Sequence, residues 1–169
     1  MVTPGGYEMS VAMTNCGRAG WVTDRSGYRY SAVDPETGRA WPIMPPMFLV
    51  LATGAAKAAG FSGFEPDACL INRYAPGAKL SLHQDKDEQD FAAPVVSLSL
   101  GETGLFRVGG LKRSDPTNSV RLSSGDAVVL GGEGRLAFHG VDRILPGTST
   151  LLPEGGRINL TLRRVTRPA

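Results

Sequence analysis

Short runs of alternating apolar and polar positions dominate the chain after residue 66, and this period-two pattern predicts β-strands. The stretches that fit a strand of about five to eight residues are 67–74, 79–85, 94–101, 105–110, 119–124, 126–132, 135–141 and 157–164. Segments rich in Gly, Pro, Asp or Ser separate them at spacings of roughly ten residues. Many short strands at such spacings favour a β-sandwich or a β-barrel.

The first part of the chain follows a different pattern. A strand is expected at 7–13, and a loop-rich aromatic region at 21–41. One helix is predicted over 46–59, because proline stands at its start, alanines fill its body and Gly60 follows its end. Its expected buried stripe consists of Met47, Leu51 and Ala55.

These elements predict a mainly β protein with a helical N-terminal flank. We expect one domain over 1–169, divided into a flank over 1–66 and a β-core over 67–169. A length of 169 residues suits a single domain with a proper core.

Composition narrows the class of protein only slightly. Hydrophobic residues make up 41% and charged residues 20%, as in ordinary soluble proteins. A net charge of +2 is too small to indicate a nucleic-acid binder by itself. Cys16 and Cys69 match no disulfide framework and no zinc motif. With no secretory signal and no apolar run near the roughly 20 residues of a membrane span, we expect a cytoplasmic protein.

The histidines are the first candidates for chemistry, because the chain contains only two. His83 and Asp85 lie two residues apart in the predicted strand 79–85, so they share a face at roughly 7 Å spacing. Asp87 continues the same face. Such a pair can hold a metal ion, and it can equally be a hydrogen-bonded pair on an ordinary polar edge.

The second histidine, His139, lies in the otherwise apolar stretch 135–141. A lone histidine on an apolar strand is more often a satisfied core residue than a ligand. Taken with His83 and Asp85, however, it completes the two-histidine, one-carboxylate set that binds non-haem Fe(II) with open positions. Zinc would need further ligands or a water molecule.

The last predicted strand carries its polar residues on one face and Ile158, Leu160 and Leu162 on the other. The polar residues are Arg157, Asn159, Thr161 and Arg163. This face is either solvated or turned into the β-core. In the second case the two arginines need anionic partners, and a small dicarboxylate would satisfy them. Asn72 and Tyr74, also two residues apart, can point at the same anion.

Several motifs in order, NRYAPGAKLSLHQDKDE, SLSLG, GGLKRSDP, AFHGV and RINLTLR, resemble the AlkB family of Fe(II)- and 2-oxoglutarate-dependent dioxygenases. The resemblance runs over nearly the whole chain. It implies a double-stranded β-helix, or jelly roll, and oxidative dealkylation of N-alkylated bases such as 1-methyladenine and 3-methylcytosine. The N-alkyl group is hydroxylated and lost as an aldehyde, while 2-oxoglutarate becomes succinate and CO2. Leu130 departs from the pattern, since an aromatic residue is expected there.

The same resemblance implies roles for individual residues. The iron ligands would be His83, Asp85 and His139. Arg157 would meet the 2-oxoglutarate carboxylate nearest the metal, and so belong to the catalytic residues, while Arg163 would pair with the far carboxylate. Helpers in binding the co-substrate would be Asn72, Tyr74 and Asn159.

Substrate would meet a lid formed by Trp21 and the segment Tyr28, Arg29 and Tyr30, with Asp87 accepting a hydrogen bond from the exocyclic amine of the base. Arg113, beside Lys112, would approach the substrate strand. The expected partner of this monomer is alkylated single-stranded DNA, with duplex DNA and RNA as alternatives. Two other classes stay open: an oxygenase of a protein or small molecule, which would not need Asp87, Trp21 and Tyr28, and a metal-binding module without turnover.

Overall fold

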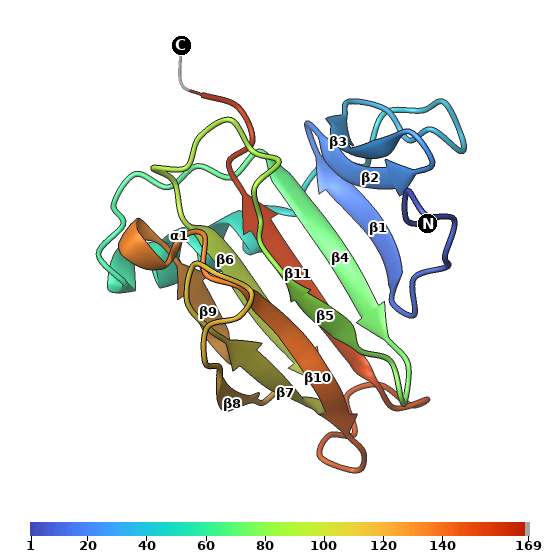
Figure 1. The fold of residues 1–169 in the computed structure, drawn as a ribbon. Helices are drawn as coiled ribbons and strands as arrows, with labels where there is room; N and C mark the ends of the chain where they lie inside the picture. Colours follow the sequence, from blue (N-terminus) through green and yellow to red (C-terminus); the bar gives the residue numbers. More distant parts are fainter. Residues whose placement is uncertain (168–169) are drawn as a thin grey trace.

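Two antiparallel sheets face each other in the computed structural model, which describes residues 1–167 (Figure 1). The strand order is β1-β4-β11-β6-β9 in the five-stranded sheet and β5-β10-β7-β8 in the four-stranded sheet. A separate hairpin, β2-β3, lies beside β1 at one edge (Figure 1). The mainly β prediction is therefore confirmed, and the end of the expected domain, 168–169, lies outside the described residues.

The strands of the five-stranded sheet are β1 (Ala12–Gly17), β4 (Ala68–Tyr74), β6 (Val95–Gly101), β9 (Ala127–Leu130) and β11 (Arg157–Arg163). Those of the four-stranded sheet are β5 (Leu80–His83), β7 (Thr103–Val108), β8 (Asn118–Leu122) and β10 (His139–Leu145). The hairpin consists of β2 (Gly20–Asp24) and β3 (Gly27–Ser31), and the helices are α1 (Pro46–Ala58) and the 3-10 turn η1 (Gly132–Gly134).

Most predicted strands appear within a few residues of their expected bounds, but three expectations fail. In the stretch 7–13, Glu8 forms an isolated bridge with Val2, and the strand itself begins at Ala12. Strand β1 then extends the sheet of the core, so the sheet crosses the predicted division at residue 66. The aromatic region 21–41 contains the β2-β3 hairpin. In 135–141, the strand begins only at His139, because a 3-10 turn precedes it.

Helix α1 covers the outer face of the five-stranded sheet. It packs through Phe48, Ala52 and Ala56, together with Ala55, against Leu160 and Leu162 of β11 and their neighbours. The predicted stripe is wrong for two residues, since Met47 is 61% and Leu51 50% exposed. The first turns are apolar on every side, so periodicity could not choose the face. The alanine face is the one that is buried, because its small side chains let the helix approach the sheet closely. No helix in the described part of the chain is long and apolar enough to cross a membrane.

Strand β11 decides what lies between the two sheets. It is paired on both sides, with β4 and with β6, so both its faces are covered. Its apolar residues point to α1, and strand alternation therefore turns the polar face inward. Arg157, Asn159, Thr161 and Arg163 are all buried. The alternative of a solvated face is excluded, and the interior holds two arginines.

A second apolar cluster closes the interior at one end of the sandwich. Tyr74 of β4, Phe106 of β7 and Val141 of β10 pack together there with Val11, Ala78, Leu122 and Ile144. Cys16 and Cys69 sit opposite each other on β1 and β4, and both thiols are free and buried.

The close pairing of β5 and β10 yields the first prediction. Gly140 follows His139, and a Cβ there would lie 2.5 Å from the Leu80 carbonyl oxygen and 2.9 Å from that of Ser81. Gly140→Ala should therefore push the two strands apart and lower the free energy of unfolding by about 1–3 kcal/mol, measured by urea denaturation.

Gly54→Ala is the matched control, because a Cβ on this exposed helical residue meets nothing within 4 Å. It should stabilise the protein by about 0.5–1 kcal/mol. A Gly140→Ala protein as stable as the parent would show that the β5–β10 contact tolerates a methyl group.

Candidate metal centre and its pocket

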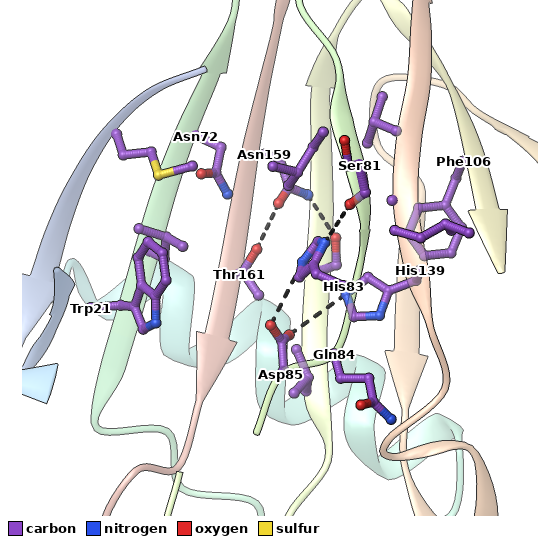
Figure 2. Close-up of a pocket in the computed structure, with 18 of the residues that line it drawn as sticks. Trp21, Asn72, Ser81, His83, Gln84, Asp85, Phe106, His139, Asn159 and Thr161 are labelled. Carbon is purple, nitrogen blue, oxygen red and sulfur yellow. Dashed lines mark hydrogen bonds and ion pairs between the residues drawn. The ribbon is translucent and has the colours of Figure 1, made fainter. Parts of the chain in front are cut away.

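His83 and His139 are brought together by strand pairing. They are direct partners on the antiparallel strands β5 and β10, and their ring centroids are 4.5 Å apart. Figure 2 shows both rings turned toward the carboxylate of Asp85. His83 is the last residue of its strand, and Asp85 lies in the following loop. The predicted strand alternation thus ends at His83, yet the three side chains still converge.

Backbone carbonyls define how the two imidazoles are protonated. The Nδ1–H of His83 donates to the Ser81 carbonyl at 2.9 Å, and that of His139 donates to the Ala137 carbonyl at 2.9 Å. A carbonyl can only accept, so each Nδ1 carries the proton and each Nε2 keeps its lone pair. Burial also lowers the pKa of His139, which favours the neutral form that binds metals.

Asp85 faces both lone pairs without bonding to either imidazole. Its Oδ1 is 3.8 Å from His83 Nε2 and its Oδ2 is 3.7 Å from His139 Nε2. These distances exceed those of hydrogen bonds. The Oδ2 atom is buried and has no hydrogen-bond partner among residues 1–167. Candidate ligand atoms of the three residues all lie within 4.8 Å of one another. This donor set fits a divalent metal ion, and the simple hydrogen-bonded pair does not account for it.

The charge of Asp85 is held by Arg163. Burial alone would raise the pKa of the Asp85 carboxyl group, but the nearby positive charge of Arg163 keeps it at about 2. Arg163 Nη2 donates to Asp85 Oδ1 at 2.7 Å, and both side chains are 6% exposed. The same ion pair raises the pKa of Arg163 despite its burial. The carboxylate is therefore ionised and ready for a metal at neutral pH.

The triad borders a cavity of about 600 Å³ between the sheets. The cavity is also lined by the inward residues Asn72, Tyr74, Arg157, Asn159 and Arg163, and by Trp21, Tyr28, Asp87 and Arg113 toward its mouth. Except for Arg29 and Tyr30, all the site residues predicted from the sequence line this one cavity. Figure 2 shows Trp21 across the cavity from the histidines.

Arg157 lies at the opposite end of β11 from Arg163, six residues away or roughly 20 Å between Cα atoms. Its Nη2 donates to Ser99 Oγ at 2.7 Å, and its guanidinium lies 5.7 Å from the centre of the Tyr74 ring. It crosses to the other sheet over Gly104, where a Cβ would collide with it. Its Nε and Nη1 have no hydrogen-bond partner among residues 1–167.

The positions of the two arginines relative to the triad are the reverse of those that the predicted roles require. Arg163, and not Arg157, stands beside the triad, because the strand runs so that Arg163 meets the loop after β5. Arg157 faces the far part of the cavity with two unsatisfied donors. Burial lowers the pKa of Arg157, as expected for a cation without a carboxylate partner.

The other predicted helpers differ in how much bonding capacity they keep. The Oδ1 atom of Asn72 is buried and has no hydrogen-bond partner in the described part of the chain. Burial raises the pKa of the Tyr74 hydroxyl to about 12, so it remains a potential donor at neutral pH. Asn159 is already engaged, since its amide donates to Ser97 Oγ at 2.6 Å and to the Leu98 carbonyl at 3.0 Å.

At the mouth of the cavity the lid residues form a connected surface. Trp21 and Tyr28 stack with ring centroids 5.5 Å apart and an interplanar angle of 16°. The indole N–H of Trp21 donates to Asp87 Oδ2 at 2.7 Å. Arg113 reaches from the β7-β8 connection, donates to the Leu82 carbonyl at 2.6 Å and lies over Phe138.

Two predicted lid residues do not face the cavity. Arg29 points to the other side of the hairpin and pairs with Asp24 at 2.7 Å, as strand alternation requires between Tyr28 and Tyr30. Tyr30 turns inward beneath the lid, where its hydroxyl contacts Glu88 and Arg163. Neither residue is placed to touch a substrate in the cavity.

Sequence reasoning missed two charged residues. Glu88 and Arg135 form a buried ion pair of 3.0 Å, and Arg135 Nη1 also donates to the Asp85 carbonyl at 2.7 Å. Arg135 thereby holds the loop that carries Asp85. The available signal was a charged residue at the start of the apolar stretch 135–141.

Comparisons with known proteins agree with this site. A family model for the 2OG-Fe(II) oxygenase superfamily matches residues 1–163. The chain is 59% identical over 164 residues to the alpha-ketoglutarate-dependent dioxygenase AlkB of Escherichia coli K12, covering 97% of this chain and 76% of that protein. It is 34% identical over 129 residues to the mouse nucleic acid dioxygenase ALKBH1, covering 76% of this chain and 33% of that protein.

Among solved structures, that of OsALKBH1 superposes with a TM-score of 0.81 and 34% identity, covering 94% of this chain and 82% of that one. The jelly-roll prediction is thereby confirmed. Fold, triad and buried arginines define an Fe(II)- and 2-oxoglutarate-dependent dioxygenase. Within that class, the chain belongs to the AlkB family of the 2OG-Fe(II) oxygenase superfamily.

Proposed function

We propose that this enzyme removes alkyl groups from N-alkylated bases of nucleic acid, with His83, Asp85 and His139 as its iron ligands. The observation that carries the proposal is the lining of the cavity. Buried arginines with unsatisfied nitrogen atoms line its interior, and the stacked rings of Trp21 and Tyr28 line its mouth. When bound, Fe(II) supplies the activation of O2 that converts 2-oxoglutarate to succinate and CO2 and hydroxylates the N-alkyl carbon.

The co-substrate would lie between the two arginines. Arg163, beside the triad, would neutralise the 2-oxoglutarate carboxylate nearest the metal, and Arg157 would pair with the distal carboxylate through its unsatisfied Nε and Nη1. A planar guanidinium suits bidentate pairing with a carboxylate. The Tyr74 hydroxyl and the amide of Asn72 would complete the polar wall, while Asn159 would orient it from the centre of β11.

The substrate base would enter through the lid. A base inside a duplex cannot reach a metal held between two sheets, so the enzyme would take single strands or extrude the nucleotide. Trp21 and Tyr28 would stack on or clamp the nucleotide, and Arg113 would approach the strand. Trp21 donates a hydrogen bond to Asp87 Oδ2 and so orients the carboxylate. The second carboxylate oxygen would then accept a hydrogen bond from the exocyclic amine of adenine or cytosine.

This arrangement favours nucleic acid over the two other classes. A module without turnover has no use for two arginines that are 1% and 5% exposed in the interior that contains the candidate metal site. An oxygenase of proteins or small molecules has no need of the connected Trp21, Tyr28 and Asp87 at the mouth. The mouse relative is itself a nucleic acid dioxygenase by name.

We further propose that the protein acts as a monomer and favours single strands. A net charge of +2 implies few phosphate contacts, so binding should weaken only modestly with salt. Extruding a base from a duplex also has an energetic cost that a single strand avoids.

The deciding experiment incubates the protein with Fe(II), 2-oxoglutarate, O2 and an oligonucleotide carrying 1-methyladenine or 3-methylcytosine, and weighs the product. The parent protein should lower the mass of the oligonucleotide by one CH2 group. It should do so for single strands at least as fast as for duplexes. His139→Ala should abolish this turnover while retaining the β-sheet circular dichroism signal. A His139→Ala protein that consumed 2-oxoglutarate at the parent rate would remove His139 from the triad.

The proposed assignment of the two arginines to the two carboxylates gives a separate prediction. Arg157→Lys replaces a planar fork by a point charge, so it should raise KM for 2-oxoglutarate by well over tenfold, which is about 1.4 kcal/mol or more. Steady-state kinetics with varied 2-oxoglutarate measures the change. Arg121→Lys, on the exposed strand β8, is the control and should leave KM unchanged. An unchanged KM in Arg157→Lys would place the distal carboxylate elsewhere.

The lid yields a prediction about coupling between the two half-reactions. Asp87→Ala and Trp21→Ala should both reduce dealkylation of methylated single-stranded DNA, while 2-oxoglutarate turnover without substrate continues. Loss of aromatic stacking is worth roughly 1–3 kcal/mol per base. Trp21→Phe keeps a stacking ring but loses the bond to Asp87, so it should retain intermediate activity.

Asp142→Ala removes an exposed carboxylate of β10 that pairs with Arg143, and it serves as the matched control. If Asp87→Ala and Trp21→Ala both repaired the oligonucleotide like the parent, the oxygenase of a protein or small molecule would become the better assignment.

A further inference from the structure

The Tyr30 hydroxyl links the lid to the metal centre. It donates to Glu88 Oε1 at 2.6 Å and accepts a hydrogen bond from Arg163 Nη1 at 3.0 Å. Arg163 in turn donates to Asp85 Oδ1 at 2.7 Å. Two hydrogen bonds thus separate a side chain of the β2-β3 hairpin from a candidate iron ligand.

The partners of Tyr30 are held firmly in the interior. The side chain of Glu88 is 1% exposed and pairs with Arg135 at 3.0 Å as well as facing Arg163 Nε at 3.5 Å. Arg163 lies on β11, which is paired with strands on both sides. A change at Tyr30 is therefore transmitted to the orientation of the Arg163 guanidinium and not absorbed by mobile surface groups.

The hairpin that carries Tyr30 is held mainly by side chains. Residues 20–31 form a two-stranded sheet of their own and share no ladder with the main sheets. Isolated two-stranded hairpins are marginally stable in water. Asn15 bonds the backbone of Trp21, and Trp41 donates to the Ser31 carbonyl. From the hairpin itself, Trp21 donates to Asp87 and Thr23 donates to the Val2 carbonyl. The contact made by Tyr30 reaches Arg163, the arginine proposed to bind the co-substrate carboxylate nearest the metal.

The hairpin also bears the substrate-facing rings. Trp21 is the cross-strand partner of Tyr30, and Tyr28 lies two residues before it on the same face. A substrate that contacts Trp21 and Tyr28 would therefore contact the same β2-β3 hairpin that bonds Arg163 through Tyr30.

We propose that Tyr30 is a positioning residue that couples the lid to the 2-oxoglutarate site. With the hairpin docked, its hydroxyl holds Arg163 in the orientation that receives the carboxylate nearest the metal. With the hairpin displaced, Arg163 loses that bond and Glu88 draws it away. The inference rests on the proposed function, and it reassigns Tyr30 from contact with substrate to control of co-substrate binding.

Coupling of this kind is reciprocal. If a substrate tightens 2-oxoglutarate binding by some factor, then 2-oxoglutarate tightens substrate binding by the same factor. A residue that merely supports folding would change stability without changing this factor, so the factor is the quantity to measure.

The test uses calorimetry on the full chain with Mn(II) in the absence of O2, so that no turnover occurs. The dissociation constant of 2-oxoglutarate is measured with and without an oligonucleotide carrying 1-methyladenine. In the parent, the oligonucleotide should tighten 2-oxoglutarate binding about fivefold or more. In Tyr30→Phe, which keeps the ring and loses the hydroxyl, the ratio should fall toward one. Tyr7→Phe, at a residue 76% exposed, is the control and should keep the parent ratio.

A second measurement uses the parent protein alone, so it remains informative if Tyr30→Phe folds poorly. Hydrogen exchange of the backbone amides in residues 20–31 should slow when Mn(II) and 2-oxoglutarate are added to the parent without nucleic acid. Unchanged exchange in the hairpin, or a Tyr30→Phe ratio equal to that of the parent, overturns the coupling. A parent that binds 2-oxoglutarate but dealkylates no oligonucleotide would instead refute the proposed substrate class.

Discussion

The ion pair between Arg163 and Asp85 is the interaction on which the rest of the site depends. It joins β11 of one sheet to the loop that follows β5 of the other, and both side chains are buried. A buried charge that loses its partner is strongly destabilising, by about 3–5 kcal/mol. The pair therefore fixes where the loop lies, and with it the distance from Asp85 to both histidines. The same pair keeps the carboxylate ionised, as a metal ligand must be.

Arg157 is also buried, but unlike Arg163 it is not paired with a carboxylate of the described residues. It has one bond to Ser99, no carboxylate partner and two unsatisfied donors among the described residues. Such an arrangement destabilises the protein alone and strengthens binding of an anion, because the anion removes an existing penalty. The two buried arginines therefore differ: Arg163 is already paired with Asp85 beside the metal site, while Arg157 keeps unsatisfied donors for the distal carboxylate of the co-substrate.

The sequence predicted the strands and the convergence of the site better than its internal order. Alternation in 157–163 placed the polar residues on one face, and the use of both histidines indicated a metal set, because strand periodicity is a local property. Alternation alone left open whether that face was solvated or turned into the β-core. The order of Arg157 and Arg163 depends on which end of β11 meets the loop after β5, which is a matter of tertiary topology. The buried face of α1 could not be chosen either, since its first turns are apolar on every side. Tyr30 was placed on the lid but not beneath it, because its partners Glu88 and Arg163 are 58 and 133 residues away.

The stretch after His83 explains how one short segment serves three parts of the site. Because the strand ends at His83, the following carboxylates are freed from strict alternation. Asp85 turns inward to Arg163, Asp87 turns to Trp21 at the mouth, and Glu88 is buried against Tyr30 and Arg135. The groups that would do the chemistry stand on or beside doubly paired strands, which are rigid, while the substrate-facing rings stand on a separate hairpin. This loop is the physical contact between the rigid and the adjustable part, so the metal, the base and the lid are all connected through residues 85–88.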